Sequence, residues 1–238
     1  MFGKSGIADT NLIKNDDGEP CSNSGTITFS GKNGSGNDDG VLYIGGLAGQ
    51  FTAINKIEGG FENSGSIIFN GEHNGSDLCI GGIAGNNGVA PYKADGTRVI
   101  DDTLVFSGEK IECSGTITKG TPYIGGIFGC STQNIVDAKV FTNISAVGFT
   151  NVGMITGSAR VAGTVVASNC AVGGMICTSK TGEGEAERLN EIELKAGTYF
   201  NYIYGSADWT GVADYDGCGY IDSIDDDTPD YATQQPAE

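Results

Sequence analysis

The chain has 238 residues, 40 of them glycine, and its formal net charge at pH 7 is −17. A chain this acidic repels phosphate backbones and anionic lipid surfaces, and it has no basic stretch interleaved with aromatic residues, so we expect no nucleic-acid binding. No apolar run approaches the roughly 20 residues of a membrane-spanning helix, so we expect no membrane insertion.

Two short phrases recur along the chain. A Ser-Gly-x-Ile phrase is followed, after a variable gap, by an aromatic-Ile-Gly-Gly-Ile-x-Gly phrase. The pairs occupy residues 24–27 with 43–49, 64–67 with 79–85, 114–117 with 123–129 and, in degenerate form, 162–165 with 171–177. Repeats at a period of tens of residues mark units that cannot bury an apolar face alone and must stack.

The phrases are rich in β-branched residues and are bounded by turn residues, which predicts short strands. We therefore predict an all-β fold, a parallel β-helix or β-solenoid of about four degenerate repeats with a C-terminal cap. One inward-facing ladder would comprise Ile44, Ile80, Ile124 and Val172, and a second Leu47, Ile83, Ile127 and Met175. A Gly-rich β-sandwich and a β-propeller are the alternatives. The matched columns disfavour the sandwich, and two or three strands per unit disfavour the propeller.

The composition divides the chain into three parts. Residues 1–20 are an N-terminal extended segment, 21–180 hold the repeats, and 181–238 form an acidic, aromatic-rich cap and tail. Within the last part, 183–196 fits either an acidic helix or a strand. Met1–Gly6 shows no apolar signal region, which leaves open an exported protein without its leader or a virion component assembled inside a cell.

The seven cysteines are predicted to be small buried hydrophobes, because an odd count at wide spacing argues against a disulfide framework. Stacked neighbours could still oxidise. His73 is the only histidine, and it lies among Asn, Gly and Ser residues that read as an exposed loop between strands. A triad built on this histidine is therefore not expected.

The acidic end contains one candidate metal site. Residues 214–225 resemble the calcium loop of EF-hand or dockerin modules, with oxygen ligands on Asp214, Asp216, Tyr220 (its carbonyl), Asp222 and Asp225. Cys218 stands where a further oxygen ligand is expected, and no helix is predicted to follow. An acidic, solvated turn is the alternative, and no other cofactor is predicted.

The same region is the most aromatic part of the chain. Its rings would either form the cap over the last coil or present a carbohydrate-stacking platform, and the cap is the stronger interpretation. The candidate ligand-binding residues are Tyr199, Tyr202, Tyr204 and Trp209.

An enzyme is not expected. Glycosidase chemistry needs two carboxylates across a cleft. Asp101 and Asp102 are the only acidic pair beside a predicted strand in the middle of the stack, and they read as turn residues. The chain lacks the Gly-His-Gly and Arg-Ile-Lys elements that a resemblance to polygalacturonases would require.

The repeated phrases resemble the Gly-Gly-Leu-Val-Gly core of GLUG-type repeats. They are more specifically similar to the Ser-Gly-x-Ile…Ile-Gly-Gly-Ile-Ala-Gly repeats of surface proteins from gut Bacteroidota, over residues 20–180. The resemblance implies an extracellular or cell-surface β-solenoid that binds a glycan or a protein partner without catalysis. The alternatives are a structural phage virion or filament subunit, with self-assembly, and a β-helix carbohydrate-active enzyme.

Overall fold

The computed structural model describes residues 2–6, 12–13, 19–34, 40–52, 56–57, 60–88, 104–132, 135–159, 167–181, 185–189, 204–207 and 218–226. These residues form strands joined by turns and bends, so the predicted all-β class is confirmed. The described ranges include no helix with the length and apolar character needed to cross a membrane.

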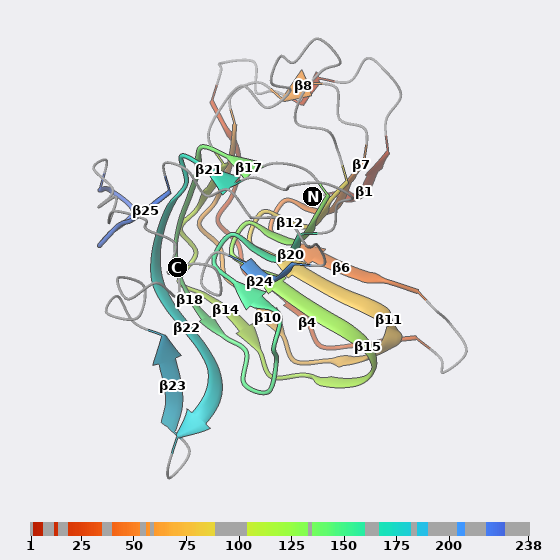
Figure 1. Ribbon diagram of the computed structural model, residues 1–238. Helices are drawn as coiled ribbons and strands as arrows, with labels where there is room; N and C mark the ends of the chain where they lie inside the picture. The colour runs from red at the N-terminus through yellow and green to blue at the C-terminus, as the bar shows by residue number, and fades with distance from the viewer. Residues whose placement is uncertain are drawn as a thin grey trace.

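The strands lie in three main sheets (Figure 1). Sheet 1 contains, in spatial order, β1 (Phe2–Gly6), β7 (Ala48–Thr52), β12 (Ala84–Asn87), β16 (Phe128–Ser131), β20 (Thr156–Ala159) and β24 (Tyr204–Ala207). Sheet 2 contains β3 (Cys21–Asn23), β9 (Phe61–Asn63), β13 (Leu104–Phe106), β18 (Ala138–Ser145), β14 (Lys110–Cys113), β10 (Ile67–Phe69) and β4 (Ile27–Phe29), with β22 (Ala171–Thr181), β23 (Glu185–Leu189) and β25 (Gly219–Tyr220) beside them. Sheet 3 contains β19 (Val152–Gly153), β15 (Thr116–Gly125), β11 (Glu72–Gly81), β5 (Lys32–Asn33) and β6 (Leu42–Gly45).

Two smaller pairs complete the list: β2 (Leu12–Ile13) with β8 (Lys56–Ile57), and β17 (Ile135–Val136) with β21 (Ala167–Ser168). Every described pairing is parallel except that of β22 with β23. Parallel pairs join segments one copy apart in the chain, so successive copies add strands to all three sheets. The predicted boundary at residue 180 falls inside β22.

The first aliphatic ladder is in register through three of its four predicted members. Ile44 pairs with Ile80, and Ile80 pairs with Ile124. The next member is Val152, which pairs with Ile124 in sheet 3. The prediction of Val172 was wrong, because Val172 lies in sheet 2 opposite Val140.

The second ladder also differs from the prediction in its fourth member. The Leu47 amide donates to the Ile83 carbonyl, the Ile83 amide to Ile127, and the Ile127 amide to Ile155. Met175, the predicted fourth member, instead pairs with Asn143 of β18. The fourth Gly-Gly phrase is therefore Val152–Gly157, in which Met154 replaces the second glycine.

The third Ser-Gly phrase is also displaced. Ile27 pairs with Ile67, as the phrases predict, but Ile67 then pairs with Ile111. Ile117, from the phrase at 114–117, instead pairs with His73 in sheet 3. The stacked equivalent in the third copy is Ser107-Gly108, where the Ser107 amide donates to the carbonyl of Asn63. A chain with 40 glycines repeats short Gly-containing phrases by chance, so the phrase alone does not fix the register.

The last glycine of each Gly-Gly phrase lets sheet 1 approach sheet 3 backbone to backbone. A Cβ on Gly85 would lie within 2.8 Å of backbone atoms of Ile44, Gly49 and Cys79, and one on Gly157 within 2.8 Å of those of Tyr123 and Ile124. A side chain has no room there, so glycine is required by close approach.

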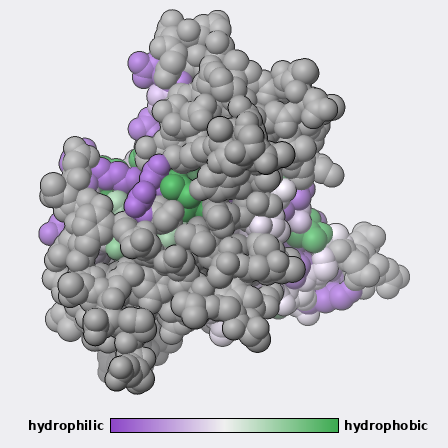
Figure 2. Space-filling model, turned by 45° about the horizontal axis from the view of Figure 1, so that its top comes forward, coloured by the Kyte–Doolittle hydropathy of each residue, from purple (hydrophilic) through white to green (hydrophobic). Residues whose placement is uncertain are grey.

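The interior is filled by columns of like residues from successive copies. One column of sheet 2 is Ile27, Ile67, Ile111, Ile144 and Ile176. Another begins with two asparagines. Asn23 Nδ2 donates to Asn63 Oδ1 at 2.9 Å, and Asn63 Nδ2 donates to the backbone carbonyl of Gly82 at 2.6 Å. On the face drawn in Figure 2, hydrophobic surface among the described residues is limited to small areas between hydrophilic ones.

Candidate functional site

One corner of the stack has connections of very different length. The chain passes there from sheet 1 to sheet 2, through residues 7–20, 53–60, 88–103, 132–137 and 160–170. We call this the connector corner. The strands on either side are neighbours in their sheets, so these connections leave and re-enter the stack at adjacent points. Loops held this way by a rigid scaffold are a common location for binding residues.

The described parts of the connectors are themselves ordered into strands. β2 pairs with β8, and β17 pairs with β21, and Figure 1 shows β8, β17 and β21 toward the top of the molecule. Two thiols support the second pair: Cys170 Sγ lies 3.7 Å from the Ile135 carbonyl and Cys218 Sγ lies 3.3 Å from that of Ala167. These contacts are buried, and they hold β17 and β21 against the stack at the base of the connector corner.

Aromatic rings form the other part of that base. Phe51, at the end of β7, stacks on Phe61 at 5.1 Å and meets the edge of Phe128 at 6.4 Å. All three are at most 3% exposed. Beside them, the Thr132 hydroxyl donates to the carbonyl of Asn87 at 3.2 Å. The connectors therefore emerge from a packed platform.

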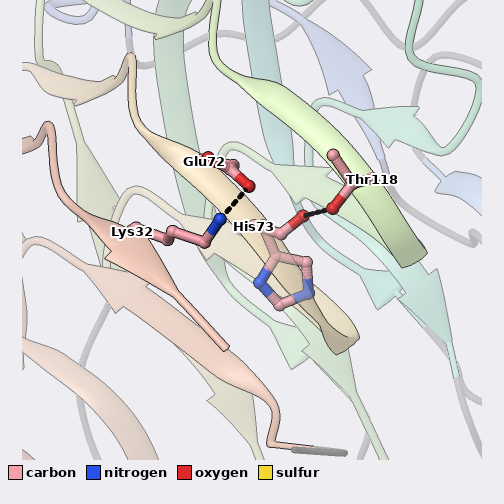
Figure 3. Close-up of polar contacts among 4 residues, drawn as sticks. All are labelled: Lys32, Glu72, His73 and Thr118. Carbon is pink, nitrogen blue, oxygen red and sulfur yellow. Dashed lines mark hydrogen bonds and ion pairs between the residues drawn. The ribbon is translucent and has the colours of Figure 1, made fainter. Parts of the chain in front are cut away.

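His73 is not in a loop, and that prediction was wrong. It lies in β11, fully buried, and pairs with Asn33 on one side and Ile117 on the other. The turn-like sequence around it forms a strand because neighbouring copies supply a hydrogen-bonding partner on each side. The Thr118 hydroxyl donates to the His73 carbonyl at 3.2 Å, and next to it Lys32 and Glu72 form an ion pair at 2.6 Å (Figure 3).

Only one of the two ring nitrogens of His73 has a polar partner among the described residues. Its Nδ1 lies 3.1 Å from Nδ2 of Asn33, whereas its Nε2 has no hydrogen-bond partner among the described residues. Burial lowers the pKa of the ring below its ordinary value, opposed by the charge of Asp77. The neutral ring is therefore favoured, and His73 is a structural member of its column.

The cysteines divide into one disulfide and five thiols. Cys79 of β11 and Cys130 of β16 are bonded, which links sheet 3 to sheet 1 across a sequence separation of 51. The spacing argued against a disulfide framework but left oxidation of stacked neighbours open, and this one bond joins residues of neighbouring copies. The other cysteines are thiols. Burial raises the pKa of Cys113, and a hydrogen bond with the Cys218 thiol, together with burial, raises that of Cys170.

The candidate calcium loop is described only in part. Asp214 and Asp216 lie outside the described residues. Tyr220 ends β25, which pairs with β22, and Asp222 and Asp225 follow with exposed side chains. Within the described part of the chain, no group of three or more His, Cys, Asp or Glu side chains could hold a metal ion.

The candidate aromatic platform and the acidic pair lie almost entirely outside the described residues. Tyr199, Tyr202, Trp209, Asp101 and Asp102 fall there. The backbone of Tyr204 begins β24, opposite Thr156. The connector corner itself could have been found in the sequence from the unequal spacing between successive copies.

Comparison of the chain with profiles of known protein families, with curated proteins and with solved structures gave no match.

Proposed function

We propose that this chain is a non-enzymatic β-solenoid that binds a glycan or a protein partner through the connector corner. The observation that carries the proposal is the contrast between fixed coils and variable connections. Ile44, Ile80, Ile124 and Val152 stay in register, while the connections at one corner range from residues 132–137 to residues 88–103. A scaffold that served only as a spacer would have no need of long connections gathered on one side.

The solenoid interpretation extends the observed stacking. Successive copies add strands to sheets 1, 2 and 3, and the parallel pairings join equivalent residues of neighbouring copies. A coil that returns over itself in this way is the arrangement implied by the resemblance to GLUG-type and Bacteroidota surface repeats. In such a stack each coil contacts only its neighbours, so loops can vary without disturbing the core.

We propose an extracellular or cell-surface location, with a virion as the alternative. The Cys79–Cys130 disulfide supports it, because structural disulfides persist in oxidising compartments and are rare in the cytosol. The net charge of −17 supports a partner other than nucleic acid.

The experiment exchanges connections within the chain. In the test variant, residues 88–103 are replaced by residues 53–60, which join the equivalent strands one copy earlier. In the matched control, residues 34–41, which join β5 to β6 within sheet 3, are replaced by residues 74–77. Wild type and both variants are compared on an array of mucin, plant and bacterial-surface glycans and against surface-protein extracts.

We expect wild type and control to bind the same probe and the test variant to bind at least about tenfold more weakly. Equal binding by all three proteins would place the contact away from the connector corner. Absence of any binding by wild type would contradict the proposed function. Release of shortened products from a bound glycan would instead favour the carbohydrate-active enzyme.

A further inference from the structure

The first coil has an open edge. β3 pairs with β9, β4 with β10, and β5 and β6 with β11. Among the described residues, no strand pairs with these four on their other side. We call β3 and β4 together the first-coil edge. In a parallel ladder the backbone groups of alternate residues point to opposite neighbours, so this edge presents unpaired donors and acceptors.

Apolar columns reach this edge without being covered. Ile27 and Phe29 are partly exposed, whereas their in-register partners Ile67 and Phe69 are fully buried. Cys21 is likewise partly exposed, whereas Phe61, its partner in β9, is 2% exposed. The side chains are the same kind as those inside the stack, so another layer placed here would bury them in the same way.

The first-coil edge also lacks charge. Residues 20–31 include no Asp, Glu, Lys or Arg. By contrast, strands inside the stack carry Glu62, Lys110, Glu112 and Lys139. Proteins that remain monomeric protect exposed edges with charges, prolines or bulges. Here β3 and β4 carry no charge, so this protection is missing from them.

At the opposite end, the last long strand of sheet 2 is partly covered. β22, the last long strand of sheet 2, pairs with β23 and β25. Val152, on the last described strand of sheet 3, is only 4% exposed. Two copies can therefore meet through the same edge of each. Contact between like surfaces closes a dimer, whereas contact between unlike ends would build a filament.

We propose that a second copy of this chain docks on the first-coil edge to form a closed, head-to-head dimer. The neutral edge is where two chains of net charge −17 approach with little repulsion. The sequence of β4 is self-complementary: antiparallel pairing centred on Thr28 places Ile27 of one copy opposite Phe29 of the other. Such β-branched and aromatic pairs stabilise antiparallel strands.

The test is the mass of the full chain in solution, by light scattering and sedimentation, over a range of concentrations at low and high salt. We expect a monomer–dimer equilibrium that persists at high salt. Thr28→Lys places a charge in the middle of the edge, on a side chain that is exposed in one copy. We expect this variant to remain monomeric at concentrations at least tenfold above those at which wild type is dimeric.

Thr150→Lys is the matched control, since it makes the same change at an exposed threonine beyond β18. It should dimerise as wild type does, and unchanged circular dichroism would show that both variants fold. A wild-type monomer at all concentrations, a Thr28→Lys dimer, or open-ended oligomers would each overturn the proposal.

Discussion

The backbone contact between sheets 1 and 3 gives the sharpest test of the fold. Gly157 belongs to the fourth Gly-Gly phrase that the stacking reveals. A Cβ on this residue would lie within 2.8 Å of three backbone atoms of β15, from Tyr123 and Ile124. Gly157→Ala therefore requires two sheets to separate. Overpacking costs about 1–3 kcal/mol when side chains can yield. Since the three nearest atoms are all backbone, we expect a loss of about 3 kcal/mol or more.

For a chain of this size, that loss corresponds to a decrease in Tm of roughly 6–12 °C. The assay is thermal unfolding followed by circular dichroism, with urea midpoints as a second measure. Gly40→Ala is the control, because a Cβ at Gly40 meets no atom within 4 Å. It should stay within about 1 kcal/mol of wild type. If the two variants unfolded at the same temperature, sheets 1 and 3 would not be in backbone contact and the corrected register would be wrong.

Three further predictions follow from the described contacts. Replacing Cys79 and Cys130 by serine should cost about 4 kcal/mol, from the loop-closure entropy of a separation of 51 residues, and reductant should lower the unfolding midpoint of wild type but not of the double variant. Burial lowers the pKa of His73 below 6.5, so the unfolded chain binds the proton more readily than the folded chain. The free energy of unfolding should therefore fall as the pH decreases from about 6.5 through the folded-state pKa. His73→Asn should make the urea midpoint depend less on pH between pH 7 and 5, and an unchanged dependence would contradict this. Asn63→Ala should cost about 2–4 kcal/mol by chemical denaturation, since it leaves buried backbone groups unpaired, whereas Asn23→Ala at the exposed first coil should cost less than half as much.

The cysteines and the histidine show where sequence reasoning reached its limit. Their local sequences gave no information on the partners that stacking supplies. His73 follows Asn-Gly-Glu, which favours a turn in isolation, but pairing with β5 and β15 on both sides makes it a strand residue. Cys79 and Cys130 are far apart along the chain and close in space because they belong to neighbouring copies.

The fourth copy shows the same limit for the repeat itself. Val172-Gly173-Gly174-Met175 matches the phrase in sequence, yet it lies in β22 against β18. Gly174 is required there for a different reason, because its φ is +100° and a Cβ would meet the backbone of Thr142. The stacked equivalent, Val152–Gly157, has Met154 at the second glycine, so its sequence departs from the phrase.

The sequence by itself determined the all-β class and the stacking of like on like, since β-branched residues at a repeated spacing can bury their apolar faces only against neighbouring copies. It also determined the Ile44, Ile80 and Ile124 column. Only the tertiary structure decided which later phrases belong to the stack, which cysteines meet, and which edge has no partner strand among the described residues. These depend on the lengths of the connections between coils, which set the register and carry no pattern of their own.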